Sequence, residues 1–167
     1  KPALPLGWAL SRLPQLIAPS GRFLDGDWVE SKDQDPQGAV RLTQLDDVGD
    51  GVWKNRSSRF LTREKAKALR CTILERGDVL VARMPDPLGR SCLFPGDPQD
   101  CVTVVDVCIL RPAHDGVSAR WLSHFINAPQ LRSAIYRLQS GSTRQRISRK
   151  NLGTVELLIP PTNEQHR

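Results

Sequence analysis

Val102-Thr-Val-Val-Asp-Val-Cys-Ile-Leu110 is the most strongly strand-forming stretch of the chain. Six of its nine residues are Val, Thr or Ile, whose β-branched side chains pack well on a pleated surface. A nearly continuous apolar run is typical of a strand that is covered on both faces. We therefore predict one central strand over residues 102–110.

Two shorter apolar segments are the expected partners of this strand. Val79–Arg83 follows a turn, and Ser91–Phe94 returns after a loop that contains two prolines and a glycine. Such a loop is rigid, and loops on a fixed scaffold often carry recognition residues. Arg83 and Arg90 flank this loop, so we predict that their side chains reach base edges of a nucleic acid.

The N-terminal part of the chain predicts short elements separated by turns. Ala39–Leu45 alternates as a strand, with Val40 and Leu42 on one face. Thr62 is a suitable N-cap for a helix through Leu69. We also expect an extended piece at residues 8–10 and a single helical turn at 13–17. At 25–28 we expect a tight turn with Trp28 packed behind it.

The C-terminal part predicts two consecutive helices and a last strand. Ser118–Asn127 ends before a proline, and Pro129–Gln139 carries an apolar stripe at helical spacing. Gly141 suits the C-terminal cap of the second helix, and Thr154–Ile159 reads as a strand. Strands early and helices late predict an α+β domain, with a mixed, mostly antiparallel, twisted sheet and flanking helices.

Composition limits the class of protein. The chain has 167 residues, enough for one domain with a core, and its net charge of +6 favours an acidic partner. Its four cysteines lack the two-residue gap of a zinc-binding pair, so we expect no structural metal. We expect neither a signal peptide nor a membrane span, and therefore a reduced, cytoplasmic protein.

The charge is distributed unevenly. Arg22–Asp50 holds eight acids and three cations, whereas Lys54–Arg70 holds seven cations and one acid. Arg132–Lys150 holds six cations and no acid. This separation predicts one face that meets phosphates and another that meets solvent or protein.

The stretch Ser140–Lys150 has the residue types of a nucleic-acid contact. Arg and Gln bond base edges bidentately, while Ser, Thr and Lys suit phosphate oxygens. We predict mixed contacts from its first part and phosphate contacts from its end and from the earlier basic segment. The full set of predicted DNA-binding residues is Arg83, Arg90, Ser142, Thr143, Arg144, Gln145, Arg146, Arg149, Lys150, Lys54, Arg56 and Arg59.

Catalytic motifs are missing from the sequence. It has no glycine-rich dinucleotide loop, no phosphate-binding Gly-Lys-Ser/Thr loop and no Gly-x-Ser-x-Gly elbow. Asp25, Asp27, Glu30 and Lys32 loosely resemble a metal-dependent nuclease site, but they lie too close together in the chain. A nuclease, an RNA-binding domain with stacking aromatics and a protein-interaction module remain as alternatives.

Six short blocks occur in a characteristic order along the chain. They are Pro5-Leu6-Gly7-Trp8, Asp25-Gly26-Asp27-Trp28, Val40-Arg41-Leu42-Thr43-Gln44, Gly77-Asp78-Val79-Leu80-Val81-Ala82-Arg83, Gly141-Ser142-Thr143-Arg144-Gln145-Arg146-Ile147-Ser148, and Pro160-Pro161 with Glu164-Gln165. Together they resemble the target recognition domain of the DNA-specificity (S) subunit of type I restriction–modification systems. The resemblance implies a DNA methylase specificity domain-like fold over residues 1–159, and the start of a spacer helix at 160–167.

The same resemblance implies a function without catalysis. Such a domain recognises one half of a split double-stranded DNA target. Methyltransferase (M) subunits then methylate adenine with S-adenosylmethionine, and a separate restriction (R) motor subunit cleaves. Neither a cofactor nor a catalytic residue is therefore expected in this chain. The same module also occurs in single-chain restriction–methylation enzymes, so the type of parent protein stays open.

Overall fold

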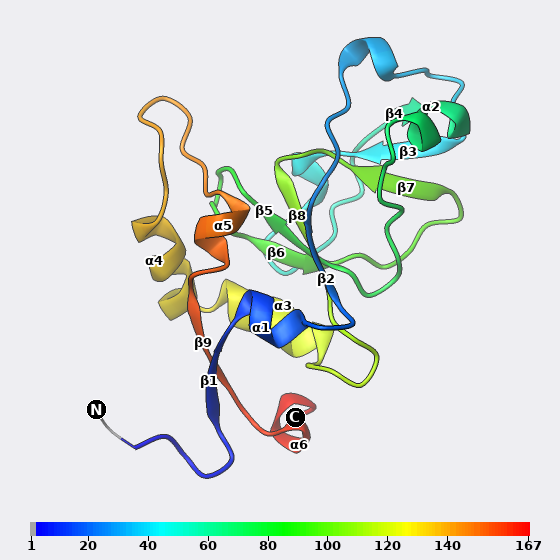
Figure 1. Cartoon of the computed structure of the whole chain (residues 1–167). Coiled ribbons are helices and arrows are strands. Elements are labelled where there is room, and N and C mark those ends of the chain that lie inside the picture. The colour runs from blue at the N-terminus through cyan, green and yellow to red at the C-terminus, as the bar shows by residue number, and fades with distance from the viewer. Residues whose placement is uncertain (1–2) are drawn as a thin grey trace.

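The strands form three separate sheets, with orders β2-β8-β5-β6, β4-β3-β7 and β1-β9. The computed structural model describes residues 3–167 (Figure 1). The strands are β1 (Ala9–Arg12), β2 (Arg22–Asp25), β3 (Val40–Thr43), β4 (Arg59–Leu61), β5 (Val79–Ala82), β6 (Ser91–Leu93), β7 (Asp100–Thr103), β8 (Val107–Arg111) and β9 (Glu156–Ile159). The helices are α1 (Leu13–Ile17), α2 (Arg63–Ala68), α3 (Ala119–Asn127), α4 (Pro129–Arg137), α5 (Arg149–Leu152) and α6 (Thr162–Gln165), with single 3-10 turns at Ser31–Asp33 and Leu45–Asp47.

The stretch 102–110 is two strands, so the prediction of one continuous strand is wrong at its middle. β7 pairs with β3 in parallel, whereas β8 lies between β2 and β5, antiparallel to both. The N–H of Val107 donates to the carbonyl of Val104 at 3.0 Å and closes a turn between the strands. Asp106 is the only charge in the stretch, and this turn leaves it at the surface. The chain thereby passes from one sheet into the next.

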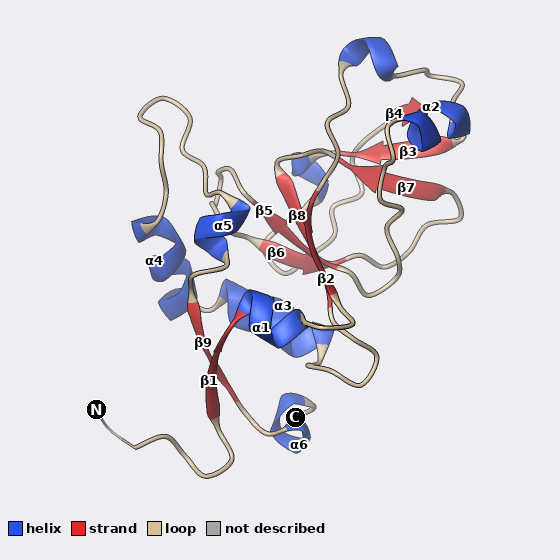
Figure 2. Cartoon of the chain, viewed as in Figure 1, coloured by secondary structure: helices blue, strands red, loops and turns tan. Residues whose placement is uncertain are grey.

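Both faces of the β2-β8-β5-β6 sheet are covered, as the apolar runs predict. Along β5 and β8, alternate side chains enter two different hydrophobic clusters. The cluster on the helical face contains Val79, Val81, Cys108 and Leu110, and the cluster on the other face contains Leu80, Ala82, Val107 and Ile109. Figure 2 shows α1, α3 and α5 to one side of this sheet, and β3, β4, β7 and α2 to the other. The expected α+β class, with mostly antiparallel pairing, is confirmed.

A two-stranded ribbon brings the two ends of the described chain together. β1 pairs antiparallel with β9, so that Leu10 lies opposite Leu158 (Figure 1). These two leucines are half-exposed, whereas Leu157 on the other face is fully buried.

Within residues 3–167, none of the helices has the length and apolar character needed to span a lipid bilayer.

The start of α2 agrees with the predicted Thr62 cap, and α3 and α5 begin with caps of the same kind. The hydroxyl groups of Thr62, Ser118 and Ser148 accept hydrogen bonds from the backbone three residues ahead, at the starts of α2, α3 and α5. The end of α4 differs, because Leu138 is its C-cap and Gly141 lies in the following loop with φ +90°. These caps depend on short-range hydrogen bonds, which a sequence pattern captures well.

Trp28 and two strands depart from the predictions. Trp28 is 70% exposed instead of being held behind its turn, and its indole N–H donates to Glu30 at 3.2 Å. The strands β2 and β4 were not predicted. β2 is held by pairing with β8, far away in the sequence, and β4 by pairing with β3 across a long loop.

Candidate nucleic-acid interface

A loop with an exposed tip stands out between α4 and α5 (Figure 1). Ser140 and Arg146 exchange two backbone hydrogen bonds, of 2.8 and 3.0 Å, that close the base of the loop. Gly141–Gln145, the tip loop from here on, has all five residues exposed. A Cβ at Gly141 would lie 2.3 Å from the Arg144 carbonyl oxygen, so this turn requires glycine.

The base of the tip loop is anchored in the core. The side chain of Ile147 is fully buried, and its N–H donates to the carbonyl of Arg83 at 3.0 Å. Ser148 caps α5, and the amide of Asn151 donates to the Leu138 carbonyl at 3.3 Å. The exposed tip residues Ser142, Thr143, Arg144 and Gln145 are thus carried on a fixed base, which limits the entropy lost on binding.

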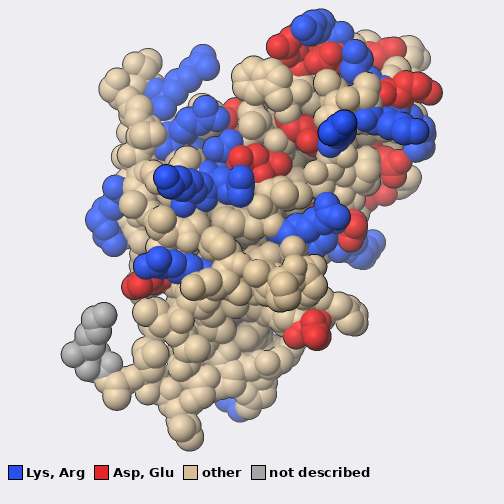
Figure 3. Space-filling view, in the orientation of Figure 1, with Lys and Arg blue, Asp and Glu red and all other residues tan. Residues whose placement is uncertain are grey.

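Three further predicted contacts, Arg146, Arg149 and Lys150, are exposed next to the tip loop. Figure 3 shows Lys and Arg side chains gathered over the side of the molecule where α4, α5 and this loop lie. Arg146 forms an ion pair with Asp106. Arg149 Nε lies 3.3 Å from Asp25 Oδ2, and the Arg149 Cζ atom lies 5.7 Å from the centre of the Phe23 ring.

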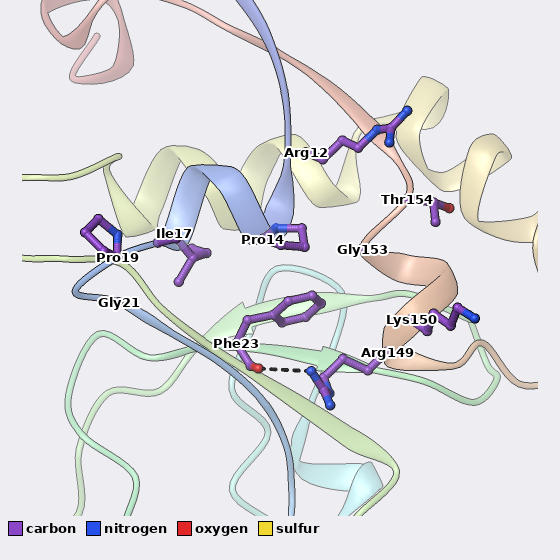
Figure 4. Close-up of a pocket in the computed structure, with 11 residues that line it drawn as sticks. Arg12, Pro14, Ile17, Pro19, Gly21, Phe23, Arg149, Lys150, Gly153 and Thr154 are labelled. Carbon is purple, nitrogen blue, oxygen red and sulfur yellow. Dashed lines mark hydrogen bonds between the residues drawn. The ribbon is translucent and has the colours of Figure 1, made fainter.

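A hollow of about 430 Å³ lies beside these cations, between α1, β2 and α5 (Figure 4). Pro14, Ile17 and Phe23 contribute apolar surface to it, and Arg12, Arg149 and Lys150 line it as well. Arg149 donates to the Phe23 carbonyl at 3.4 Å, which fixes one wall of the hollow. A contact surface here would combine apolar and cationic groups.

The structure corrects the expected placement of Arg83. Its side chain is 7% exposed, and its guanidinium donates to the carbonyls of Val105 and Ile147. Its Nε lies 3.3 Å from Asp25 Oδ1, in an ion pair without a hydrogen bond from Nε. Arg83 therefore joins the β7–β8 turn to the base of the tip loop, and in this conformation it does not reach the surface.

Arg90 is also buried, contrary to the prediction that its side chain reaches a base edge. Only 3% of the residue is exposed, and its guanidinium donates to four backbone carbonyls, those of Leu45, Val48, Met84 and Pro87, at 2.6–3.1 Å. Burial lowers the pKa of Arg90, while Asp46 and Asp86 act in the opposite direction. The loop between β5 and β6 thus turns both of its arginines inward.

The second basic segment lies elsewhere, with Lys54 and Arg56 in the loop before β4 and Arg59 at the start of β4. Lys54, Arg56 and Arg59 are exposed. The backbone N–H groups of Arg56 and Ser57 donate to the buried Asp47 carboxylate at 2.5 and 2.9 Å, which orders this loop. The structure therefore places these cations and the tip loop on different elements.

Acidic residues are interleaved with the cations, so the predicted separation into an acidic and a basic face is wrong. Carboxylates of the acidic segment pair with cations from distant parts of the chain. The pairs are Asp25 with Arg83 and Arg149, Asp33 with Lys65, and Asp50 with Arg132. Figure 3 shows both signs mixed over α2, β3 and β4.

The loosely nuclease-like residues do not converge. Asp25 pairs with arginines, Asp27 accepts from the Thr72 backbone N–H at 2.9 Å, and Glu30 pairs with Lys32 at 2.9 Å. Desolvation raises the pKa of Asp27, and the Thr72 bond opposes this. Within residues 3–167, no group of three or more His, Cys, Asp or Glu side chains is arranged to hold a metal ion.

Neither a family model nor a curated protein matches the chain, but solved structures do. A chain from a study of complex assembly and conformational transition in the type I R-M system is 22% identical. Its TM-score is 0.71, and the match covers 99% of this chain and 37% of that one. The HsdS subunit from Thermoanaerobacter tengcongensis is also 22% identical, with a TM-score of 0.69 and coverage of 99% and 36%.

This chain has the fold of part of a type I specificity subunit. The S subunit of the type I restriction–modification system from M. genitalium extends the likeness, at 15% identity and a TM-score of 0.61 over 95% of this chain and 36% of that one. The chain therefore spans little more than a third of the structures it matches. The fold expected from the six sequence blocks is confirmed.

Proposed function

We propose that this domain recognises one half of a bipartite double-stranded DNA target, as the target recognition domain of a type I specificity subunit. Two independent lines support this proposal. The fold likeness extends over 95–99% of the chain. The sequence blocks that resemble the family include the tip loop and its buried Ile147.

The tip loop is the observation that carries the proposal. Its exposed side chains combine hydroxyl groups, an arginine and a glutamine, the groups that bond phosphate oxygens and base edges. They stand on a base held by core packing and backbone hydrogen bonds. A narrow projection of this kind suits a DNA groove, and the neighbouring Arg149 and Lys150 suit the flanking phosphates.

The domain itself has no catalytic role in this proposal. Methyltransferase subunits would methylate adenine, a restriction subunit would cleave, and this domain would direct both to the target. Residues 1–159 would form the recognition domain, and the turn of helix at Thr162–Gln165 would begin the spacer helix. In a single-chain restriction–methylation enzyme the domain would recognise DNA in the same way.

Duplex binding by the purified domain tests the proposal. Fluorescence anisotropy should show binding to double-stranded DNA, with log Kd rising by several units per tenfold increase in salt, since each neutralised phosphate contributes about 0.9. Single-stranded DNA and duplex RNA of the same sequence serve as comparisons and should bind more weakly. Affinity that stays flat between low and physiological salt, or that favours RNA, would contradict the proposal.

A further inference from the structure

Two aspartates lie within the cationic surface around the tip loop. Asp25 ends β2, and Asp106 lies in the turn between β7 and β8. Each pairs with a cation next to the tip loop, Asp25 with Arg149 and Asp106 with Arg146. A carboxylate in such a position repels phosphate and competes with it for the arginine. A structural or functional role must therefore account for each of the two aspartates.

Asp25 has a structural reason. Its Oδ1 lies 3.3 Å from Nε of Arg83, whose side chain is 7% exposed. Within residues 3–167, Asp25 is the carboxylate paired with this buried guanidinium, and loss of a buried charge partner is strongly destabilising. The fold needs Asp25 whatever the ligand is.

Asp106 has no such partner. Its side chain is 30% exposed and that of Arg146 is 45% exposed. An ion pair that exposed contributes little to stability. The position of Asp106 is nevertheless fixed, because its carbonyl accepts from the Arg83 N–H at 2.8 Å and the preceding Val105 carbonyl accepts from the Arg83 side chain. The fold thus holds a dispensable carboxylate at the base of the tip loop.

We propose that Asp106 is a selectivity residue that withholds Arg146 from the phosphate backbone. The inference rests on the proposed function. Sequence-independent DNA affinity comes from cations that neutralise phosphates. By occupying Arg146, Asp106 removes one such cation and lowers affinity for every duplex. A larger share of the binding free energy then depends on base contacts from the tip loop.

A purely structural role for Asp106 predicts a different effect of its neutralisation on DNA affinity. If the pair with Arg146 mainly ordered the loop for binding, its loss would weaken DNA binding or leave it unchanged. If Asp106 withholds Arg146, its neutralisation strengthens binding to DNA of unrelated sequence. The two explanations therefore differ in the direction of the effect.

Asp106→Asn tests the inference, since it removes the charge and keeps the shape. Binding to a duplex of arbitrary sequence should strengthen about fivefold near 0.15 M salt, and the log–log salt slope should steepen by about 0.9, the contribution of one added phosphate contact. Elution from heparin should shift to higher salt. Glu75→Gln is the matched control, because Glu75 pairs with Arg111 at the opposite end of β8. It should change neither quantity.

The Arg146→Gln background identifies the mechanism. There Asp106→Asn should no longer steepen the salt slope, because the cation it releases is absent. Unchanged or weaker duplex binding by Asp106→Asn, with normal thermal unfolding, would overturn the inference and leave the proposed function standing. Absence of salt-dependent duplex binding by the unmodified domain would overturn both.

Discussion

At the scale of single residues, the buried arginines show how cationic side chains serve the fold. Arg90 donates to carbonyls at Leu45 and Val48 and to carbonyls in its own loop, so one guanidinium ties two loops together. The planar guanidinium presents several donors in fixed directions, which a lysine ammonium does not. Both arginines flanking the β5–β6 loop are therefore structural in this conformation.

Arg90→Lys should lower the free energy of unfolding by about 2–5 kcal/mol, at about 1–3 kcal/mol for each buried carbonyl left unpaired. Urea titration followed by circular dichroism measures this change. Arg144→Lys, at an exposed position in the tip loop, is the control and should leave the urea midpoint unchanged. A changed base preference with an unaltered midpoint in Arg90→Lys would instead assign Arg90 to base recognition.

The cysteines should make stability fall in alkaline solution. Burial raises the thiol pKa values from 9.0 to about 11 in Cys71 and Cys92 and to about 12 in Cys101 and Cys108. The unfolded chain therefore loses these protons first, and the free energy of unfolding should decline as pH rises above about 9. Replacing all four by Ala or Ser should flatten that decline in urea titrations at several pH values. An equal decline in the cysteine-free variant would contradict the assignment.

At the scale of elements, the tip loop combines a rigid base with a tip that has no core role. Asn151 and Ile147 fix the base, while the residues between Gly141 and Gln145 remain exposed. Changes in the tip should therefore affect recognition without affecting unfolding. Changes at the positive-φ glycine should affect the shape of the tip itself.

Base-type and phosphate-type contacts in this loop should separate on mutation. Arg144→Ala or Gln145→Ala should cost about 1–3 kcal/mol of binding to a matched half-site and relax preference at one position. Lys150→Ala should weaken all sequences alike and reduce the salt slope by about one unit. Arg120→Ala, on α3, is the exposed control. Binding to a panel of half-site variants, in an assembled methyltransferase complex, provides the measurement.

Gly141→Ala should distort the tip while the core stays folded. The added Cβ meets the Arg144 carbonyl at 2.3 Å, and φ +90° is unfavourable for alanine. We expect weaker matched-site binding with a thermal midpoint close to that of the unmodified domain. Gly77→Ala is the control, because its φ of +91° is similar but no atom lies within 4 Å of the added Cβ. Equal affinity in both variants would show that the shape of the tip is unimportant.

At the scale of the whole molecule, what could be predicted depended on how local the determining contacts are. The helix cap at Thr62 was recognisable because its partner lies three residues ahead, and the apolar run Val79–Ala82 because a buried strand has a continuous apolar pattern. The inward direction of Arg90 was not, since its partners at Leu45 and Val48 come from another segment. For the same reason the acidic segment did not form a face of its own.

The two hydrophobic clusters should unfold together, because β5 and β8 contribute alternate side chains to both. Trp121 packs against the helical cluster, where it stacks on Phe125, and Trp53 packs against the other, where it meets Phe94 edge-on. The chain has four tryptophans. Variants that keep only Trp121 or only Trp53, with Phe in place of the other three, report each cluster by fluorescence. Loss of packing in one cluster removes the strands that support the other. In each variant, the urea midpoint measured by tryptophan fluorescence should therefore equal the midpoint measured by circular dichroism. A fluorescence midpoint below the circular dichroism midpoint in either variant would show that its cluster opens separately.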